Sequence, residues 1–531
     1  MSRRKPKAVY WQDAPMPREQ MVLIPGRLDD MIPDDHPVRL LDELVDLLDW
    51  KEYESAYHGR CGQPPIHPSV LCKVLLFAMI RRIRSSRQIE YELRHAIDFM
   101  WLSSGREIDH TTLSEFRRKH ADQLRDIFNQ VIRRAIDLGV AKLSSLCIDG
   151  TRVLADANRY KTWTTDRLAR ALKLLDDQIA EALESLEVTD TLEADMWGEE
   201  ESYDRLPKSI ADLKTRRELL AKLLETTEQM DETRRHNGSK GPAQLPKTDT
   251  DSRILPNKEG GYAPNYTPMS TAETENGFVV HCDVVIGNVE HDQLLTIVDA
   301  VEADFKVEIE SIMADTAYTT GSNLSGAEEA GIELIGPTAE VETENNPAIR
   351  ADLTLPVPAE SIGQLPINPQ TKRFDKSAFI YDEQTDRYYC PAGKPLPHRT
   401  TEHTAYRGGQ PVTRYIYTCQ ECSGCPLAEM CRRKPESKRG REIMHDEHEP
   451  ARRRHRERMR TAEAKEKYKV RTHIGETPFA VIKAFFGLRR FLLRGLEGVR
   501  QEWRWASTAY NVKKLIRMMH LNPNLRFQIQ G

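Results

Sequence analysis

Two short apolar runs in this chain each end in an aspartate, and both predict buried strands that stop at a carboxylate. The run LCI at 146–148 precedes Asp149, and the run SIMA at 311–314 precedes Asp315. Apolar runs of this length are typical of buried strands. A carboxylate at a strand end is partly desolvated and needs a compensating cation, yet no cation follows Asp149 before Arg152. In the alternative interpretation, Asp149 begins an Asp-Gly turn and is simply solvated.

Strands and helices alternate around these runs, which predicts an α/β domain. Residues 266–286 predict a hairpin that turns at 275–277, ENG. The elements expected after it are a helix at 291–305, a strand at 309–318, a helix at 321–331 and a strand at 332–337.

The region before the first strand, residues 21–140, predicts an all-α domain. The segment LLDELVDLLDW has apolar residues at helical spacing, and Pro68 suits a first helical turn. Asp109 or Thr111 can cap a later helix, which Gly139 ends. Arginines recur along these helices, so the domain is a candidate for contacting DNA.

Two insertions are expected in the α/β domain. Leucines and isoleucines at spacings of three and four residues in 167–186 and 210–224 predict an antiparallel helical hairpin within 161–245. Residues 340–378 are proline-rich and aperiodic, and they begin a loop-rich, cysteine-containing insertion at 341–460.

The cysteines of this second insertion have the density of metal ligands. Cys419, Cys422, Cys425 and Cys431 follow the pattern C-x2-C-x2-C-x5-C, and Cys390 is a fifth candidate. Tetrahedral structural zinc is the first interpretation, with one cysteine left over. Metal-free or redox-labile thiols and an iron–sulfur cluster are the alternatives.

Charge is distributed unevenly along the chain. Residues 432–531 hold 26 Lys and Arg against 11 Asp and Glu, a net charge of +15, whereas the other residues hold 51 against 71, a net of −20. A basic region of this size predicts a polyanionic partner, nucleic acid first; a solvated helical face is the alternative.

Hydropathy and cysteine usage indicate where the chain works. The longest apolar run, near 70–80, is too short to span a membrane, and the N-terminus has no apolar segment of the secretory type. Nine scattered cysteines indicate a reducing compartment. We therefore expect a cytoplasmic protein, associated with the nucleoid if DNA is its partner, and no membrane contact.

A third acid completes a possible metal site. Glu476 is expected at the start of a long helix, with Lys483 two turns further on roughly the same face. Two strand-end aspartates and a helix glutamate from distant segments are what a two-metal phosphoryl-transfer site requires, because Mg²⁺ prefers oxygen ligands. Two such ions about 4 Å apart can activate an attacking oxygen and stabilise a leaving one.

Three segments, taken together in their order along the chain, resemble the DDE transposases of bacterial insertion sequences: CIDGTRV, SIMADTAY and YKVRTHIGETPFAVIK. The last resembles the Y-R-E-K signature, here Tyr468-x2-Arg471-x4-Glu476-x6-Lys483, with one residue more between arginine and glutamate than is common. DHTTLSEFRR and TDSRILPNKEGGYAPNYTP also resemble the branch with long insertions in its core. The likeness covers about residues 20–520.

The resemblance implies a ribonuclease-H-like core with a mixed five-stranded sheet. It implies Asp149, Asp315 and Glu476 as catalytic carboxylates that hold two Mg²⁺ or Mn²⁺ ions. It further implies DNA or phosphate contacts by Tyr468 and, near the third acid, by the residues Arg471 and Lys483, with Lys469 or His473 as substitutes for Arg471. Arg152 is a further candidate for a contact with the DNA backbone.

The expected activity follows from this resemblance. The chain would bind terminal inverted repeats, hydrolyse phosphodiesters to free 3′-hydroxyls and transfer them to target DNA. It would act as a homodimer or larger assembly on double-stranded DNA, reading sequence with its N-terminal helices and the cysteine insertion. A ribonuclease-H-like nuclease without strand transfer and a catalytically inactive DNA-binding protein are the alternatives.

We therefore divide the chain into seven parts. They are an N-terminal tail (1–20), a helical DNA-binding domain (21–140), the first part of the core (141–160), the helical hairpin with its linker (161–245), the continued core (246–340), the cysteine insertion (341–460) and the C-terminal catalytic helix region (461–531).

Overall fold

The computed structural model describes most of the chain and divides it into two compact units. The described residues are 26–55, 65–197, 208–236, 238–257, 260–338, 345–405, 411–437 and 439–530. Unit 1 is Met1–Phe116 and unit 2 is Arg117–Gly531. The expected N-terminal tail, 1–20, lies outside the described residues.

Unit 1 is helical throughout its described part. Its elements are η1 (Asp29–Met31), α1 (Pro37–Asp46), α2 (Lys51–Ser55), α3 (Pro68–Ile80), α4 (Ser86–His95), α5 (Ile97–Leu102) and all but the last two residues of α6, which spans His110–Arg118. Pro68 occupies the first turn of α3, and the Asp109 carboxylate caps α6 by accepting the N–H groups of Thr111 and Thr112, as the sequence predicts. In α3, the buried Lys73 ammonium lies 2.6 Å from a carboxylate oxygen of Asp42.

A mixed sheet in the order β7–β6–β1–β8–β9 runs through unit 2. Its strands are β1 (Ser145–Gly150), β6 (Tyr262–Glu273), β7 (Val279–Val285), β8 (Ser311–Met313) and β9 (Glu333–Ile335). β7, β6 and β1 are antiparallel neighbours, whereas β1, β8 and β9 are parallel. β2 (Val153–Leu154) and β5 (Arg253–Pro256) also pair with β6, so the described sheet has seven strands and not the five that the resemblance implies.

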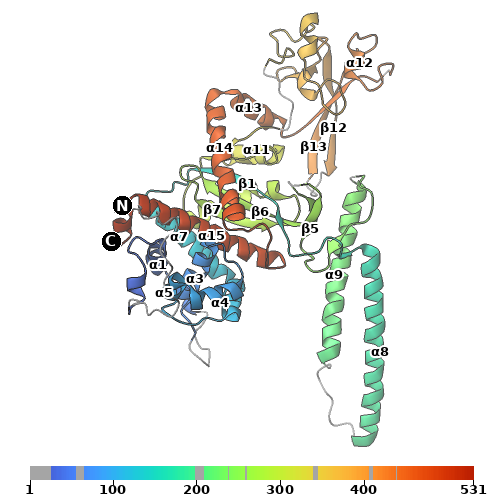
Figure 1. Ribbon diagram of the computed structural model, residues 1–531. Coiled ribbons are helices and arrows are strands. Elements are labelled where there is room, and N and C mark those ends of the chain that lie inside the picture. Colours follow the sequence, from blue (N-terminus) through green and yellow to red (C-terminus); the bar gives the residue numbers. More distant parts are fainter. Residues whose placement is uncertain are drawn as a thin grey trace, which may run out of the picture. The chain divides into compact units, whose positions relative to one another are not determined.

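Helices connect and cover this sheet (Figure 1). The 3-10 turn η2 (Glu290–Gln293) and α10 (Leu294–Phe305) lead from β7 to β8, and α11 (Gly321–Glu329) leads from β8 to β9. The largely buried α15 (Leu496–Leu521) packs on β7, where Asn511 bonds to both backbone groups of Val279 at 2.9 and 2.7 Å.

The break at residue 120 moves one N-terminal helix into unit 2. The sequence-based division ends the helical domain at residue 140, but His120 has a positive φ of 67° and interrupts the helix. The following helix, α7 (Ala121–Asp137), packs on α15 of unit 2. The chain therefore divides into its two units at residue 116, and α7 belongs to the unit that contains the sheet.

The helical hairpin consists of α8 (Thr165–Trp197) and α9 (Lys208–His236). Leu168, Leu175, Ile179 and Leu220 form its buried core, which matches the predicted spacing. β3 (Thr162–Trp163) pairs with β4 (Leu245–Pro246) and joins the two ends of the hairpin. Figure 1 shows the two helices side by side.

A second sheet, β10–β11–β12–β13–β14, follows the 3-10 turns η3 (Ala359–Gln364) and η4 (Lys376–Ala378). Its strands are β10 (Ile380–Asp382), β11 (Arg387–Tyr389), β12 (Pro395–Ala405), β13 (Pro411–Thr418) and β14 (Glu442–Asp446), with the short helix α12 (Ala428–Cys431) between the last two. All its neighbouring strands are antiparallel.

The C-terminal region returns to the first sheet. α13 (Glu449–Arg460) is followed by α14 (Ala462–Ala480), the π-helical turn η5 (Val481–Phe485), α15 and α16 (Pro523–Gln530). α14 packs on β1 and β6. In the part of the chain that the structure describes, no helix combines the length and apolarity needed to cross a bilayer.

Candidate catalytic site

Asp149 and Asp315 lie at the same edge of the first sheet. β1 and β8 are parallel and pair Cys147 with Met313, and each aspartate follows its paired residue by two positions. Because side chains two residues apart lie on one face of a strand, the two carboxylates leave the sheet on the same side. The Asp149 side chain is 13% exposed and that of Asp315 is 41% exposed.

Arg471 is the cation between these two carboxylates. Its Nη2 lies 3.3 Å from Asp149 Oδ1 and 3.9 Å from Asp315 Oδ2, so these two distances put the oxygens no more than 7.2 Å apart. Burial lowers the pKa of Arg471, but Asp149 and its other neighbours outweigh this and raise the pKa above its ordinary value. Asp149 is therefore not bare, because the Arg471 side chain pairs with it; the metal ion that we expected as its partner stays a prediction.

α14 approaches the end of β1 closely because Gly475 has no side chain. A Cβ at this position would lie 2.9 Å from Cys147 Sγ and 3.7 Å from Asp149 Cβ. Tyr468, a half-buried residue of the same helix, packs against the cluster that contains Cys147. Tyr468, Arg471 and Gly475 are spaced by about one turn each, so this face of α14 covers the strand end.

Glu476 is not brought into contact with the aspartates in this structure. Its side chain is exposed, and it lies in the last turns of α14, whereas we predicted it at the start of a long helix. That helix begins earlier, at Ala462, because Thr461 caps it by accepting the N–H of Ala464. Among the described residues, no group of three or more His, Cys, Asp or Glu side chains is arranged to hold a metal ion.

Lys483 holds the turn that follows Asp149. It lies in the π-helical turn η5, and its Nζ donates to Thr151 Oγ1 at 2.5 Å and to the carbonyl oxygen of Arg152 at 2.7 Å. The α-helical pattern ends at Ala480 and continues directly into this π-helical turn, so Lys483 follows Glu476 through a wider turn than an α-helix would give. The positive charge of the Lys483 ammonium therefore lies next to the residues that directly follow Asp149.

Glu290 and Tyr318 lie near this site, although sequence analysis did not select them. Glu290 Oε1 is 3.5 Å from Nη2 of Arg152, and its Oε2 is buried with no hydrogen-bond partner among the described residues. Burial raises the pKa of Tyr318, and the carboxylates of Glu290 and Asp149 raise it further. The available signal for Glu290 was the acidic segment EHD soon after a predicted strand.

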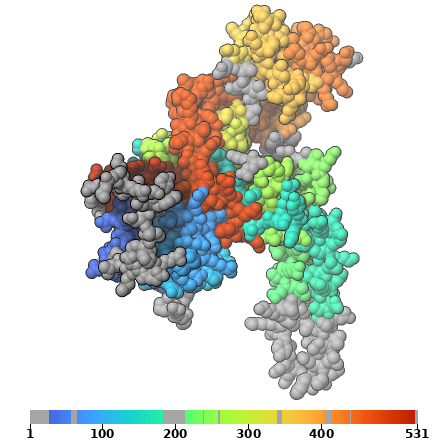
Figure 2. All heavy atoms as spheres, viewed as in Figure 1, coloured from blue at the N-terminus to red at the C-terminus, as the bar shows by residue number. Residues whose placement is uncertain are grey.

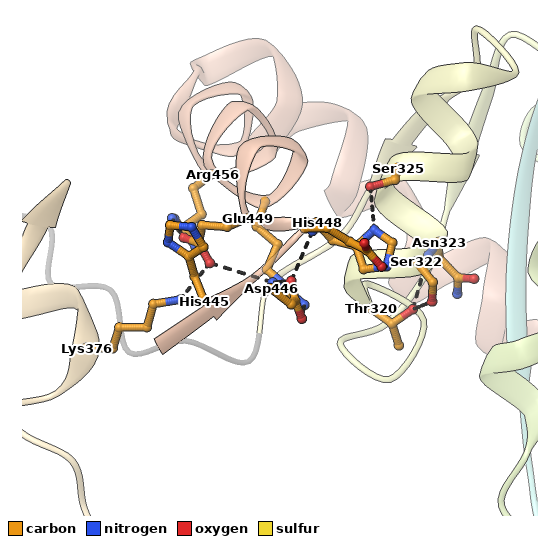
Figure 3. Close-up of polar contacts among 12 residues, drawn as sticks. Thr320, Ser322, Asn323, Ser325, Lys376, His445, Asp446, His448, Glu449 and Arg456 are labelled. Atoms are coloured by element: carbon orange, nitrogen blue, oxygen red, sulfur yellow. Dashed lines mark hydrogen bonds and ion pairs between the residues drawn. The ribbon is translucent and has the colours of Figure 1, made fainter. Parts of the chain in front are cut away.

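A buried ion-pair junction fixes the start of the segment that carries Arg471 (Figure 3). Glu449, 2% exposed, lies 2.6 Å from Lys376 Nζ and 2.9 Å from an Arg456 nitrogen. Burial raises the pKa of Glu449, but these cations lower it more, so that it stays below its ordinary value. Asp446 accepts two further hydrogen bonds from Arg452. This junction joins η4 and β14 to α13, which continues into α14.

Much of the positive charge of α13 is neutralised within the molecule. α13 and α14, orange-red in Figure 2, are exposed on the face in view. Yet the pairs Arg453–Glu383 and Arg454–Glu328, at 2.7 and 2.6 Å, add to the junction pairs. The net charge of the C-terminal region therefore overstates the positive charge that is available to bind a polyanion.

All five candidate cysteines line one small cavity beside β13 and α12. Cys390 and Cys419 are buried, and Cys422, Cys425 and Cys431 are partly buried. Cys390 and the cysteine-rich segment 419–431, which are separated in the sequence, therefore line the same cavity.

The arrangement around Arg471 favours binding of a small cation or a phosphate. One guanidinium faces two carboxylates, so the group keeps a net negative charge that attracts a divalent cation. The same guanidinium can instead pair with a phosphate. A phosphate that withdraws Arg471 would free both carboxylates.

Two family models match the chain. The model described as Transposase DDE domain matches residues 389–516, and the one described as Transposase domain (DUF772) matches residues 26–119. Arg471, Glu476 and Lys483 fall in the first match, whereas Asp149 and Asp315 lie outside both.

One solved structure with a similar chain is titled "Crystal structure of a pre-cleavage Mos1 transpososome". The likeness has 8% sequence identity and covers 55% of this chain and 66% of that one. Its TM-score is 0.14, so it carries no structural argument. No curated protein matches this chain.

Proposed function

We propose that the chain is a DDE transposase that cuts DNA at the ends of its own element and joins the freed 3′-hydroxyls to target DNA. The catalytic carboxylates in this proposal are Asp149 and Asp315, with Glu476 as the third acid. The observation that carries it is the meeting of the two aspartates across a parallel strand pair, with Arg471 between them.

The residues of the site have separate tasks in this proposal. Asp149 and Asp315 would hold divalent cations, Mg²⁺ or Mn²⁺, in two positions. Such ions, when bound, supply Lewis-acid stabilisation of charge at the scissile phosphate. Arg471 occupies the space between the carboxylates without DNA and pairs with a phosphate oxygen when DNA enters. Lys483 keeps the turn after Asp149 in place through its bonds to Thr151 and Arg152.

Glu476 must move for this site to be complete. Its side chain is exposed, one residue from the close contact at Gly475. A modest rotation of the end of α14 would turn its carboxylate towards Asp149. The π-helical turn that follows offers a place for such a change, because π-helical turns are often found at functional sites.

A ribonuclease-H-like fold is part of the proposal. Its support is the strand order β7–β6–β1–β8–β9, in which an antiparallel half adjoins a parallel half at the strand of Asp149. The helical hairpin and the cysteine module then interrupt one core. Unit 1 and the basic loop after α12 are the proposed contacts with double-stranded DNA, including terminal inverted repeats, and the assembly on two ends is a homodimer or larger.

The test uses the complete protein and the DNA that flanks its gene on both sides. Labelled flanking fragments are incubated with Mg²⁺ or Mn²⁺, and cleavage and strand transfer are measured on sequencing gels. We expect Asp149→Asn and Asp315→Asn to lose both activities, at least about 10²-fold, while binding of the fragments is kept. Asp299→Asn, at an exposed position of α10, is the matched control and should retain activity.

Two outcomes would replace the proposal. Cleavage without any joined product would favour a nuclease that does not transfer strands. Equal behaviour of the wild type and Asp149→Asn, with DNA binding retained, would favour an inactive DNA-binding protein, an alternative that the exposed side chain of Glu476 supports.

A further inference from the structure

The cysteine cavity is separate from the proposed catalytic site and has the size of a single ion. Its volume is about 20 Å³, close to the space of one water molecule. The sulfur-bearing residues reach it from the turn at Cys390, from the segment 419–425 after β13, and from Cys431 at the end of α12. Lys394, Arg432 and Arg441 also line it.

Backbone N–H groups already point at two of the sulfurs. The N–H of Lys394 donates to Cys390 Sγ at 3.3 Å, and the N–H of Arg441 donates to Cys422 Sγ at 3.4 Å. Hydrogen bonds of this kind orient a sulfur ligand at a metal site. Gly393, which has a φ of +75°, lets the chain after Cys390 turn back to place the Lys394 N–H.

Among the described residues between β13 and β14, at 419–441, the short helix α12 is the only regular element. The loop after α12, at 432–437 and 439–441, is shaped by the buried Arg432, which donates to the carbonyl oxygens of Cys422 and Ser437 at 2.9 Å each. The cysteines themselves form part of the small buried core of this module. Small modules with such limited cores are usually stabilised by a metal or by disulfides.

We propose that Cys390, Cys422, Cys425 and Cys431 bind one zinc ion in a tetrahedral site, with Cys419 as the cysteine left over. The thiols line the cavity from its wall, and among the described residues they are not yet arranged as a closed coordination group. Rotation about their Cα–Cβ bonds brings the sulfurs inward. Four thiols lose their protons on binding, and the resulting charge of −2 faces Arg432 and Arg441, whereas Lys394 pairs with Glu421, a further residue of the lining.

The choice of these four thiols rests on hydrogen bonds and burial. Cys390 and Cys422 already accept backbone N–H groups at their sulfurs, and Cys425 and Cys431 line the cavity from partly buried positions. Cys419 is the most deeply buried of the five, 2% exposed at the end of β13. The function of the ion is to fix the basic loop after α12 for contact with a DNA backbone.

The test measures metal in the full-length protein, purified under reducing conditions, by inductively coupled plasma mass spectrometry. We expect one zinc ion per chain and a loss to background in the Cys422→Ser/Cys425→Ser variant. Cys419→Ser and, as a control outside the module, Cys282→Ala should keep the ion. Replacing zinc by Co²⁺ should produce the visible absorption of a tetrahedral thiolate site.

A second measurement covers variants that fail to fold. A chelator added to the wild-type protein should speed proteolysis within 390–441 and leave the helical hairpin as resistant as before. Reduced protein that holds no zinc and gives no Co²⁺ thiolate absorption would overturn the proposal, as would iron with inorganic sulfide in the cavity. Retention of zinc by Cys390→Ser with its loss from Cys419→Ser would overturn the ligand assignment. The result is independent of catalysis, because an inactive chain would still bind the ion.

Discussion

Replacing Arg471 by glutamine should strengthen binding of Mn²⁺ to the DNA-free protein and weaken DNA cleavage. In the structure the guanidinium lies 3.3 Å from Asp149 and 3.9 Å from Asp315. At an effective dielectric constant of about 20, a charge pair at the shorter distance is worth about 5 kcal/mol, and the pair with the more exposed Asp315 is worth less. A divalent ion that binds these carboxylates must compete with this attraction.

Only part of that energy appears in the affinity, because water solvates the freed arginine and the carboxylates. We therefore expect the dissociation constant for Mn²⁺ to fall about tenfold in Arg471→Gln, which corresponds to about 1.4 kcal/mol. Cleavage of end DNA should fall about 10²-fold, because a donor to the phosphate is lost. Isothermal titration calorimetry without DNA gives the affinity, and gel assays give the cleavage rate.

Arg471→Lys is the matched variant, because it keeps the charge and should bind Mn²⁺ nearly as the wild type does. An unchanged or weaker affinity in Arg471→Gln would refute the reasoning. It would mean that Arg471 organises the two aspartates for the ion instead of competing with it. The specific expectation is that Arg471→Gln binds Mn²⁺ more tightly than the wild type and cleaves DNA more slowly.

Two further predictions concern the helix that carries this arginine. Gly475→Ala should reduce cleavage about tenfold by shifting α14 away from the strand end, because the new Cβ would meet Cys147 Sγ at 2.9 Å. The double variant Cys147→Ala/Gly475→Ala should recover most of the rate in the same gel assay, and no recovery would argue against the steric cause. Glu449→Gln should lower the free energy of unfolding by about 3 kcal/mol, since the buried carboxylate that pairs with Lys376 and Arg456 loses its charge. Because the pKa of Glu449 is depressed in the folded state, its ionic contribution is complete above the ordinary carboxyl pKa of 4.5 and disappears as the pH falls through the folded value. Denaturant titrations should therefore show the wild type and this variant converging in acid, and a constant difference at all pH values would contradict this.

Local sequence patterns sufficed for the parts of the fold that depend on local chemistry. The hairpin of β6 and β7 turns at Gly277, which has a φ of 73° and follows Asn276. The leucine spacing of α8 and α9 and the proline start of α3 are equally local. Each of these features follows from residues within a few turns of each other.

The candidate site depends on contacts that no local pattern contains. Arg471 meets Asp149 only after the whole core has folded, so its pairing was missed. The end of the α-helical pattern before Lys483 was missed because its residues have no strong helix breaker after Pro478, and the π-helical turn is set by packing. Glu290 has no apolar run directly before it, and only the turn after β7 brings it near Arg152.

The short pairing of β3 (Thr162–Trp163) with β4 (Leu245–Pro246) has a consequence for how the chain can evolve. It places the two ends of the helical hairpin next to each other, so the hairpin can become longer or shorter, or be replaced by another insertion, without a change in the strand order of the core. Related proteins could thus carry different insertions at this position on the same core.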